Sequence, residues 1–247
     1  MRGPVRLGII IPSSNTSAEP LSQAIVSSIS TKERPITVHF TRISVTQLSL
    51  SPGSNSQFTP EALLAAAQLL ADAKVQVIGW SGTSGGWLGF ENDRNLCNHI
   101  EERLGIPMTT STLGLNKLLA CMAKFEKLGL VTPYTEDVND AIIKNYTALG
   151  YPITKERERH LSIADNIQIA AIDEAKLHQM VAAVVDAGAD VVTTFCTNWN
   201  AAHLVSKWEK EFGVPILDSV ATVVWDMCNI IQVDMGTASH WGRMFEQ

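Results

Sequence analysis

One of the four cysteines, Cys196, lies where a thiol can take part in chemistry. It directly follows the strand-like run 190–195 and precedes Thr197 and Asn198. We expect a helix to begin soon after this turn, and the positive end of a helix lowers the pKa of a nearby thiol. The other three cysteines fall inside segments of helical period, where a cysteine is usually a small buried apolar residue; they are Cys97, Cys121 and Cys228. The sequence therefore predicts one catalytic cysteine, Cys196, and three that pack inside the protein.

Three further polar turns also follow strand-like runs; they span residues 12–16, 82–86 and 133–136. In open α/β sheets, ligands bind beyond the carboxyl ends of the strands. The 82–86 and 196–198 turns are rich in hydroxyls, an amide side chain and backbone N–H groups at the expected start of a helix, and this combination suits an anion. Together the four turns predict one cleft that binds a carboxylate or a phosphate.

Alternating strand-like and helix-like segments must position these turns. Runs rich in Val, Ile, Leu and Thr predict strands at 5–11, 37–43, 75–80, 127–132 and 190–195. Helical periodicity predicts helices at 60–73, 94–104, 111–123, 136–149, 174–187 and 201–212. This alternation is typical of a parallel sheet covered by helices on both faces, so the fold class is α/β.

The two halves of the sequence resemble each other in three segments that keep the same order. The pairs are LGIIIP at 7–12 with LGLVTP at 128–133, VQVIGWSGTS at 75–84 with ADVVTTFCTN at 189–198, and LGIPMTTS at 104–111 with FGVPILDS at 212–219. Such ordered similarity indicates a duplicated unit. We expect two similar Rossmann-like domains with central parallel sheets, related by a pseudo-twofold axis, with the active site in the cleft between them. The first domain spans residues 1–120, with 221–247 able to pack back onto it, and the second spans 121–220.

The composition favours a soluble globular protein that acts on small molecules. The chain has 247 residues, 45% of them hydrophobic, and a net charge of −6 from 19 basic and 25 acidic residues. This acidic balance argues against a nucleic-acid partner, and no apolar run approaches the ~20 residues that a spanning helix needs. The N-terminus lacks the apolar core of a signal peptide. We therefore expect a cytoplasmic protein with a small carboxylate substrate, and leave open whether it forms a homo-oligomer.

Motifs for a cofactor or a metal are absent from the sequence. The 82–86 turn lacks both the lysine of a phosphate-binding loop and the GxGxxG spacing of a dinucleotide site. The six histidines are scattered, without HExxH and without carboxylates at metal-ligand spacing. We expect no cofactor and no metal, and we expect His203 to be a surface or packing residue.

Five motifs, in order, give the sequence a family resemblance: PSSNT at 12–16, GTS at 82–84, PYTEDVN at 133–139, DN at 165–166 and CTN at 196–198. Together they resemble the aspartate/glutamate racemase superfamily and, within it, the branch of maleate cis-trans isomerases and arylmalonate decarboxylases. The resemblance extends over nearly the whole chain. It implies a duplicated two-domain architecture and catalysis without a cofactor. Racemases and isomerases of this superfamily typically use two cysteines, one from each domain, on opposite faces of the substrate.

Gly82 departs from that two-cysteine pattern, because it is the first-domain counterpart of Cys196. By resemblance, maleate isomerases have Cys-Thr-Ser at this turn, whereas arylmalonate decarboxylase has Gly-Thr-Ser, as this chain does. One thiol can deliver a proton to one face of a planar enediolate, but it cannot exchange protons on both faces. We therefore predict a cofactor-independent decarboxylase of a malonate-like or related dicarboxylic acid.

The resemblance also implies roles for the residues of the turns. Cys196 is the expected proton donor, and the expected hole for the enediolate is formed by Thr83, Ser84, Tyr134 and the backbone N–H groups around Thr197. The expected substrate-binding residues are Asn15, Gly82, Asn166, Thr197 and Asn198. Three of these, Asn15, Asn166 and Asn198, match the maleate isomerase side of the branch. One substrate that reconciles the two patterns has an additional carboxylate or polar arm, held by Asn15 and Asn166.

Two other functions stay open at this point. One is a maleate-type isomerase or a racemase in which another group replaces the first thiol, and the other is a catalytically reduced protein that only binds carboxylates. A serine at 81 or 84 would need an adjacent base to replace the thiol, and no histidine lies in any of the four turns. We expect Ser84 to act as a hydrogen-bond donor.

Three further features of the sequence lie outside the four turns. Two of them have two interpretations each, and the third has one. Residues 44–58 predict a loop, in which 46–50 form either a lid over the substrate or a solvated surface. Trp87 and Phe90 either line the pocket or pack in the core. The charged run 155–159 predicts a solvated, self-neutralising patch.

Overall fold

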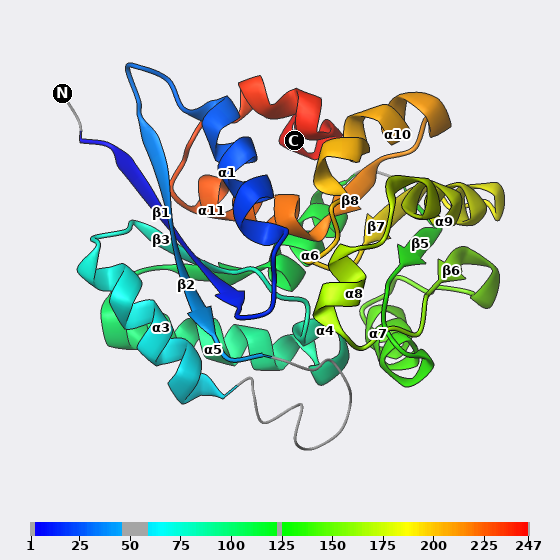
Figure 1. Ribbon diagram of the computed structural model, residues 1–247, viewed down its shortest axis with the longest axis horizontal. Helices are drawn as coiled ribbons and strands as arrows, with labels where there is room; N and C mark the ends of the chain where they lie inside the picture. The colour runs from blue at the N-terminus through cyan, green and yellow to red at the C-terminus, as the bar shows by residue number, and fades with distance from the viewer. Residues whose placement is uncertain (1–2, 46–58, 123–124, 247) are drawn as a thin grey trace.

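The computed structural model describes residues 3–45, 59–122 and 125–246. Within these residues the chain forms two four-stranded parallel sheets, with the strand orders β2-β1-β3-β4 and β6-β5-β7-β8. The strands β5 to β8 therefore take the same places in the second sheet that β1 to β4 take in the first. Figure 1 shows the first sheet to the left and the second to the right, each flanked by helices. The fold is α/β, as the sequence predicts.

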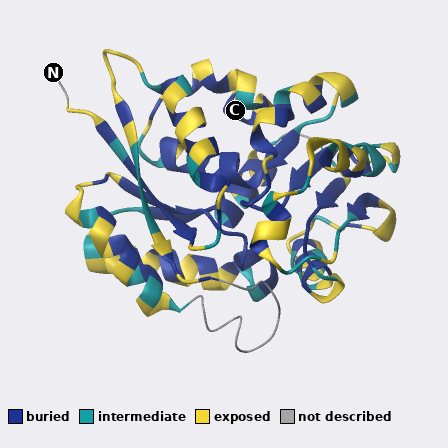
Figure 2. Cartoon of the chain, viewed as in Figure 1, coloured by how far each residue is buried: buried dark blue, intermediate teal, exposed yellow. Residues whose placement is uncertain are grey.

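The strands of the first sheet are β1 (Val5–Pro12), β2 (Ile36–Ile43), β3 (Val77–Trp80) and β4 (Met108–Thr110). Those of the second are β5 (Leu128–Val131), β6 (Glu158–Arg159), β7 (Val191–Thr194) and β8 (Ile216–Asp218). The inner strand β1 is apolar and almost wholly buried, as expected when helices cover both faces of a parallel sheet. Figure 2 shows this burial concentrated on the strands and on the helix faces turned toward them.

Among the described residues, the α-helices of the first half are α1 (Ala18–Ile29), α3 (Pro60–Asp72), α4 (Gly85–Leu88), α5 (Phe90–Leu104) and α6 (Ser111–Cys121). Those that follow are α7 (Glu136–Ala148), α8 (Asn166–Ala170), α9 (Glu174–Asp186), α10 (Val205–Phe212) and α11 (Ser219–Ile230). The part of the chain that the structure describes also contains the 3-10 helices η1 (Lys155–Arg157), η2 (Ala202–Leu204), η3 (Gly236–Trp241) and η4 (Arg243–Glu246). Across the described ranges, none of the helices combines the length and the apolar character needed to cross a bilayer.

Side chains at the carboxyl ends of strands cap the helices that follow them. These caps hold each turn in place at the end of its sheet. Thr110, the last residue of β4, caps α6 by accepting a hydrogen bond from the N–H of Leu113 at 3.0 Å. Asp218, the last residue of β8, caps α11 by accepting from the N–H of Val220 at 2.9 Å.

The long elements predicted from the sequence are present, with ends shifted by a few residues. The strands β4, β6 and β8 were not predicted, because each has only two or three residues. Of these, β4 and β8 lie inside the segments 104–111 and 212–219 that the comparison of the two halves had paired. Helices α1, α4, α8 and α11 were also not predicted.

The C-terminal helix α11 connects the two halves of the chain. It follows β8 of the second sheet but also contacts α1, α6, β3 and β4 of the first half. The C-terminal segment thus lies against the first sheet as well as the second. The division at residues 120 and 220 stays a prediction.

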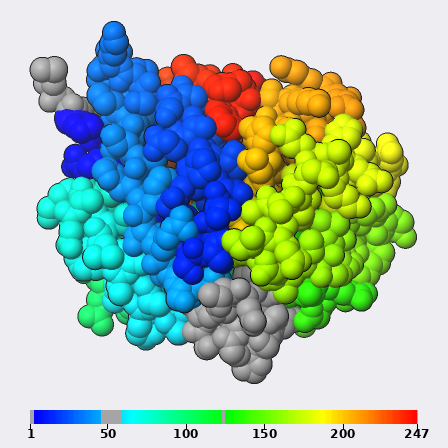
Figure 3. All heavy atoms as spheres, in the orientation of Figure 1, coloured from blue at the N-terminus to red at the C-terminus, as the bar shows by residue number. Residues whose placement is uncertain are grey.

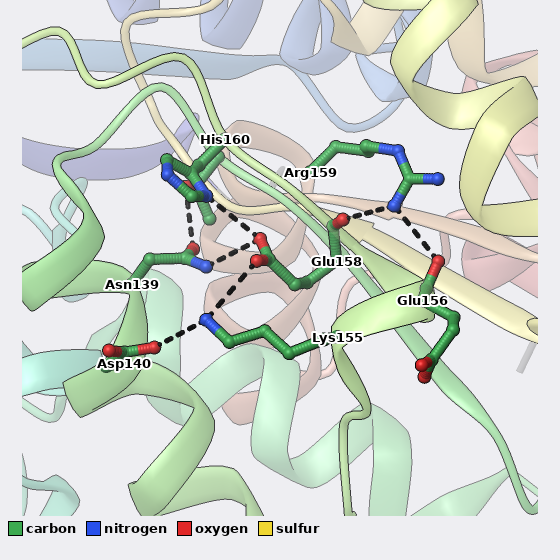
Figure 4. Close-up of polar contacts among 8 residues, drawn as sticks. Asn139, Asp140, Lys155, Glu156, Glu158, Arg159 and His160 are labelled. Carbon is green, nitrogen blue, oxygen red and sulfur yellow. Dashed lines mark hydrogen bonds and ion pairs between the residues drawn. The ribbon is translucent and has the colours of Figure 1, made fainter.

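The charged run 155–159 is only in part the solvated patch that the sequence predicted, because Lys155 and Glu156 are exposed but Arg157 and Glu158 are buried. Glu158 is only 7% exposed, and its carboxylate accepts a hydrogen bond from Nδ2 of Asn139 at 2.8 Å and lies 3.1 Å from Nδ1 of His160. Figure 4 shows it between these two residues and Lys155. Arg157 is also buried and donates to the carbonyl of Leu128 at 2.9 Å. The prediction is wrong for Arg157 and Glu158, because both find partners on other segments and lie at the edge of the second sheet.

The cysteines outside the predicted site differ from one another. Cys97 and Cys228 are buried, as predicted, but Cys121 is exposed at the end of α6. The prediction that Cys121 packs inside the protein is therefore wrong, because its helix ends at this residue.

Candidate active site

The structure brings all nine predicted site residues together around one narrow cavity with about 20 Å³ of free volume. The nine are Asn15, Gly82, Thr83, Ser84, Tyr134, Asn166, Cys196, Thr197 and Asn198, and they line it with Pro12, Trp80 and Trp87. Residues of both halves thus contribute to the same cavity. Figure 3 shows the blue first half and the green and yellow second half in contact along a continuous seam.

The site residues come from turns at the carboxyl ends of strands, as in other open α/β sheets. Asn15 lies between β1 and α1, Tyr134 between β5 and α7, and Asn166 begins α8. The segment from Gly82 to Ser84 connects β3 to α4, and Cys196 to Asn198 follow β7. Because β3 and β7 hold equivalent places in the two sheets, Gly82 and Cys196 come from equivalent turns.

The Cys196 thiol lies at the centre of a short hydrogen-bonded chain. Its Sγ accepts a hydrogen bond from the N–H of Asn198 at 3.4 Å and another from the Tyr134 hydroxyl. The Tyr134 hydroxyl also shares a hydrogen bond of 2.6 Å with Oγ1 of Thr83. The chain therefore joins the thiol of the second half to a hydroxyl of the first half, and all of its side chains are buried.

Burial raises the pKa of the Cys196 thiol to about 11, and the hydrogen bonds from Tyr134 and from backbone N–H groups offset this only in part. The sequence had predicted a lowered pKa from a helix beginning after the turn. That prediction is wrong, because η2 begins only at Ala202 and α10 at Val205. Burial also raises the pKa of Tyr134 well above its ordinary value. Both groups therefore keep their protons at neutral pH.

The three asparagines hold the two halves of the chain together at the cavity. Oδ1 of Asn198 accepts from the N–H of Thr16 at 2.9 Å, and its Nδ2 donates to the carbonyl of Asn166 at 2.6 Å. Nδ2 of Asn15 donates to Oγ1 of Thr197 at 3.2 Å. Nδ2 of Asn166 donates to Oγ of Ser14 at 2.8 Å. These amides are therefore structural cross-links as well as lining residues.

No formally charged residue is among those that line the cavity in the described part of the chain. A bound carboxylate would meet only hydroxyls, amides, a thiol and backbone N–H groups. Ser84 is 5% exposed, and its hydroxyl donates no hydrogen bond within the described residues. It is therefore available to a ligand, and its role as a hydrogen-bond donor stays a prediction.

Other residues considered from the sequence lie elsewhere. His203 is outside the cavity, with Nε2 2.9 Å from the carboxylate of Glu174, as expected of a surface residue. Trp87 lines the cavity and packs edge-on against Tyr134 at 5.1 Å, whereas Phe90 packs against Tyr146. The proposed lid at 46–50 lies outside the described residues.

Trp80 is the lining residue whose part in the cavity sequence reasoning missed. It precedes Gly82 by two residues, and a large aromatic residue so close to a site glycine was the available signal. Within the described residues, no group of three or more His, Cys, Asp or Glu side chains is placed to share a metal ion.

Comparisons with known proteins bear on the family of this chain. A family model described as arylmalonate decarboxylase matches residues 38–245. A maleate isomerase of Geobacillus stearothermophilus is 24% identical over 230 residues, which cover 89% of each chain. A maleate isomerase of Nocardia farcinica is 23% identical and covers 98% of this chain and 96% of its own.

Solved structures share the fold over the whole chain. The maleate isomerase of Pseudomonas putida S16 superposes with a TM-score of 0.82 at 20% identity and covers 98% of each chain. A structure of arylmalonate decarboxylase superposes with a TM-score of 0.71 at 19% identity and covers 98% of this chain and 99% of its own. Likeness at these identities shows the fold, whereas the match of the family model over most of the chain shows the family. This protein therefore belongs to the arylmalonate decarboxylase and maleate isomerase family of the aspartate/glutamate racemase superfamily.

Proposed function

We propose that the protein is a cofactor-independent decarboxylase of a malonate-like or related dicarboxylic acid. The observation that carries the proposal is the unequal pair of turns at the cavity, with a thiol at Cys196 and no side chain at Gly82. One acid supports protonation from one side, whereas a two-cysteine isomerase or racemase needs a group on each side. The raised pKa of Cys196 supports the same function, because a thiol that keeps its proton can donate it.

The proposed reaction has two steps whose atoms and charges balance. The bond between the α-carbon and one carboxylate carbon breaks, and that carboxylate leaves as carbon dioxide. Its bonding electron pair passes to the α-carbon and the remaining carboxylate, which together form an enediolate. Cys196 then gives its proton to the α-carbon, and the resulting thiolate takes a proton from water.

Neutral donors in the cavity suit the stabilisation of this enediolate. Thr83, Ser84 and Tyr134 place three hydroxyls on the lining, and the turn after β7 adds backbone N–H groups. Such preorganised donors act where negative charge develops, and each is worth about 3 kcal/mol. Tyr134 keeps its proton because of its raised pKa, and so it remains a donor.

Asn15 and Asn166 support a substrate with an additional carboxylate or polar arm. An amide group has two N–H bonds, and each of these residues uses one of them for a hydrogen bond between segments. Within the described residues the second N–H of each has no acceptor, and we propose that a ligand in the cavity accepts from it. Both residues would therefore bind the arm without giving up their structural hydrogen bonds.

Carbon dioxide release tests the proposal. The panel comprises malonate, 2-alkyl and 2-aryl malonates with and without a further polar arm, and maleate. We expect release from at least one malonate, and Cys196→Ala should lower kcat by about 10³-fold while leaving carboxylate binding, measured by calorimetry, largely intact. Cys121→Ala is the matched control, because this thiol is exposed and is not among the residues that line the cavity.

Each result of that panel has a distinct meaning. Failure of every substrate to release carbon dioxide would contradict decarboxylation. Release that survives in Cys196→Ala would remove the cysteine from the mechanism. Carboxylate binding without turnover of any substrate would instead indicate a catalytically reduced binding protein.

Isomerisation is the second candidate, favoured by the maleate isomerases among the relatives and by the asparagines at 15 and 166. Incubation with maleate, followed by separation of fumarate, distinguishes it from decarboxylation. Fumarate formation that requires Cys196, without release of carbon dioxide, would replace the leading proposal with this one.

A further inference from the structure

Trp80 occupies the space that any side chain on Gly82 would need. A Cβ at Gly82 would lie 2.6 Å from Nε1 of Trp80 and closer still to Cε2 and Cζ2. Non-bonded heavy atoms prefer separations of roughly 3.5–4.0 Å, so the indole and a side chain at 82 exclude each other. Trp80 is the last residue of β3, is only 1% exposed, and lines the catalytic cavity beside Gly82. The second thiol is therefore not simply missing, because an aromatic ring stands in its place.

We propose that Trp80 is a specificity-determining residue that seals the Gly82 side of the cavity, so that a planar intermediate receives its proton only from Cys196. The stereochemical consequence rests on the proposed decarboxylation, whereas the mutual exclusion of the two side chains does not. Gly82 and Cys196 come from equivalent turns of the two sheets, so the indole blocks the position equivalent to the acid. An indole N–H donates a hydrogen bond but does not give up its proton at physiological pH. Trp80 can therefore contact the substrate without acting as a second acid.

A second, larger cavity also has the Trp80 indole in its lining, so the indole separates two cavities. This cavity of about 590 Å³ is also lined by Trp80 and Ser84, together with residues of α3 and α5 such as Leu63, Asn92 and Leu96. The catalytic cavity, by contrast, has only about 20 Å³ of free volume. Trp80 thus lies between the narrow catalytic cavity and the wider second cavity. Shortening it would join the two spaces and admit water to the Gly82 side.

The first test measures directly whether Trp80 and a side chain at position 82 exclude each other, and it does not require catalytic activity. Melting temperatures are compared for the wild type, Gly82→Cys, Trp80→Val and the double variant, in a double-mutant cycle. We expect Gly82→Cys to lower Tm by about 5 °C or more in the presence of Trp80, but by less than about 2 °C in the Trp80→Val background. Trp80→Phe serves as a milder second background if Trp80→Val does not fold.

The second test measures the stereochemical consequence with 2-methyl-2-phenylmalonate, whose decarboxylation gives a chiral acid. The wild type should form one enantiomer in large excess. In Trp80→Val the fraction of the minor enantiomer should rise by at least about tenfold, because water reaches the opposite face. Trp241→Phe is the matched control: it also shortens a tryptophan, but one in η3 that is not among the residues lining the cavity, so the enantiomer ratio should stay at the wild-type value.

Two results would overturn the inference. Equal losses of Tm from Gly82→Cys in both backgrounds would show that the indole is not what excludes a side chain at 82. An unchanged enantiomer ratio in an active Trp80→Val variant would show that Trp80 does not set the face of protonation. If the wild type releases no carbon dioxide, the proposed function fails, and the Tm cycle still decides whether Trp80 and a residue at 82 compete for one space.

Discussion

Cys196 must be a protonated thiol to donate a proton, but a thiolate to attack a substrate as a nucleophile. The dependence of kcat/KM on pH distinguishes these two mechanisms. Burial raises the pKa of this thiol from 9.0 to about 11. At neutral pH the thiolate population is therefore about a hundredfold smaller than for an unperturbed thiol, a free-energy difference of about 3 kcal/mol. If Cys196 donates a proton, kcat/KM should be flat from about pH 7 to about pH 9 and should fall only toward about pH 11. If the thiolate attacks the substrate, kcat/KM should instead rise about tenfold per pH unit over this range.

The assay follows carbon dioxide release at constant ionic strength, and circular dichroism confirms the fold at each pH. Thiolate absorbance titrates the cysteines directly, and subtraction of a Cys196→Ser variant removes the signal of exposed Cys121. A raised pKa also links the thiol to stability: this contribution is fully present below about pH 9 and is lost as the pH rises toward about 11. The wild type should therefore lose stability in that window, and Cys196→Ser should lose less. A kcat/KM that rises with pH, or a thiol that titrates near pH 9, would refute the reasoning.

Two further predictions concern the hydrogen bonds around the thiol. Tyr134→Phe should lower kcat by about 10²-fold through loss of a donor to the enediolate, and it should move the alkaline fall of kcat/KM to higher pH, because this hydroxyl lowers the pKa of Cys196; an unchanged kcat would contradict the role. Asn198→Ala should lower the free energy of unfolding in urea by about 1–3 kcal/mol, because it leaves the carbonyl of buried Asn166 without its donor. Exposed Asn200→Ala is the control for that measurement and should have little effect, and equal losses in both variants would contradict the cross-linking role of Asn198.

The strands that carry the site could be predicted because their sequences are apolar and recur in the two halves of the chain. The run that forms β1 is almost wholly buried, and its counterpart β5 leads to Tyr134 in the same way that β1 leads to Asn15. Short strands gave no such signal. The two residues of β6, Glu158 and Arg159, are charged, and Glu158 is buried only because Asn139 and His160 lie beside it in the folded chain.

The members of the site could be predicted, but not their environment. Turns at strand ends and their residue types located Cys196, yet the direction of its pKa shift was predicted wrongly. A helix start and a buried turn look alike in sequence, because both follow a strand with small polar residues. The burial that raises the pKa of Cys196 depends on side chains from the other half of the chain. One of them is Thr83, which shares a hydrogen bond with Tyr134. The contact of Trp80 with Gly82 likewise depends on a side-chain rotamer that the spacing does not fix.

The absence of charged residues from the described lining bears on the choice between the two reactions. A bound dicarboxylate brings two negative charges beside Cys196, and like charges disfavour a further anion, so substrate binding should raise the pKa of the thiol further. A thiolate nucleophile would need a nearby cation to offset this, and the lining supplies none. Decarboxylation needs no thiolate: one carboxylate leaves as neutral carbon dioxide, and both negative charges remain on the enediolate, which hydroxyl and N–H donors can stabilise. Proton transfer from Cys196 then begins from a thiol that the negative charges of the substrate have kept protonated.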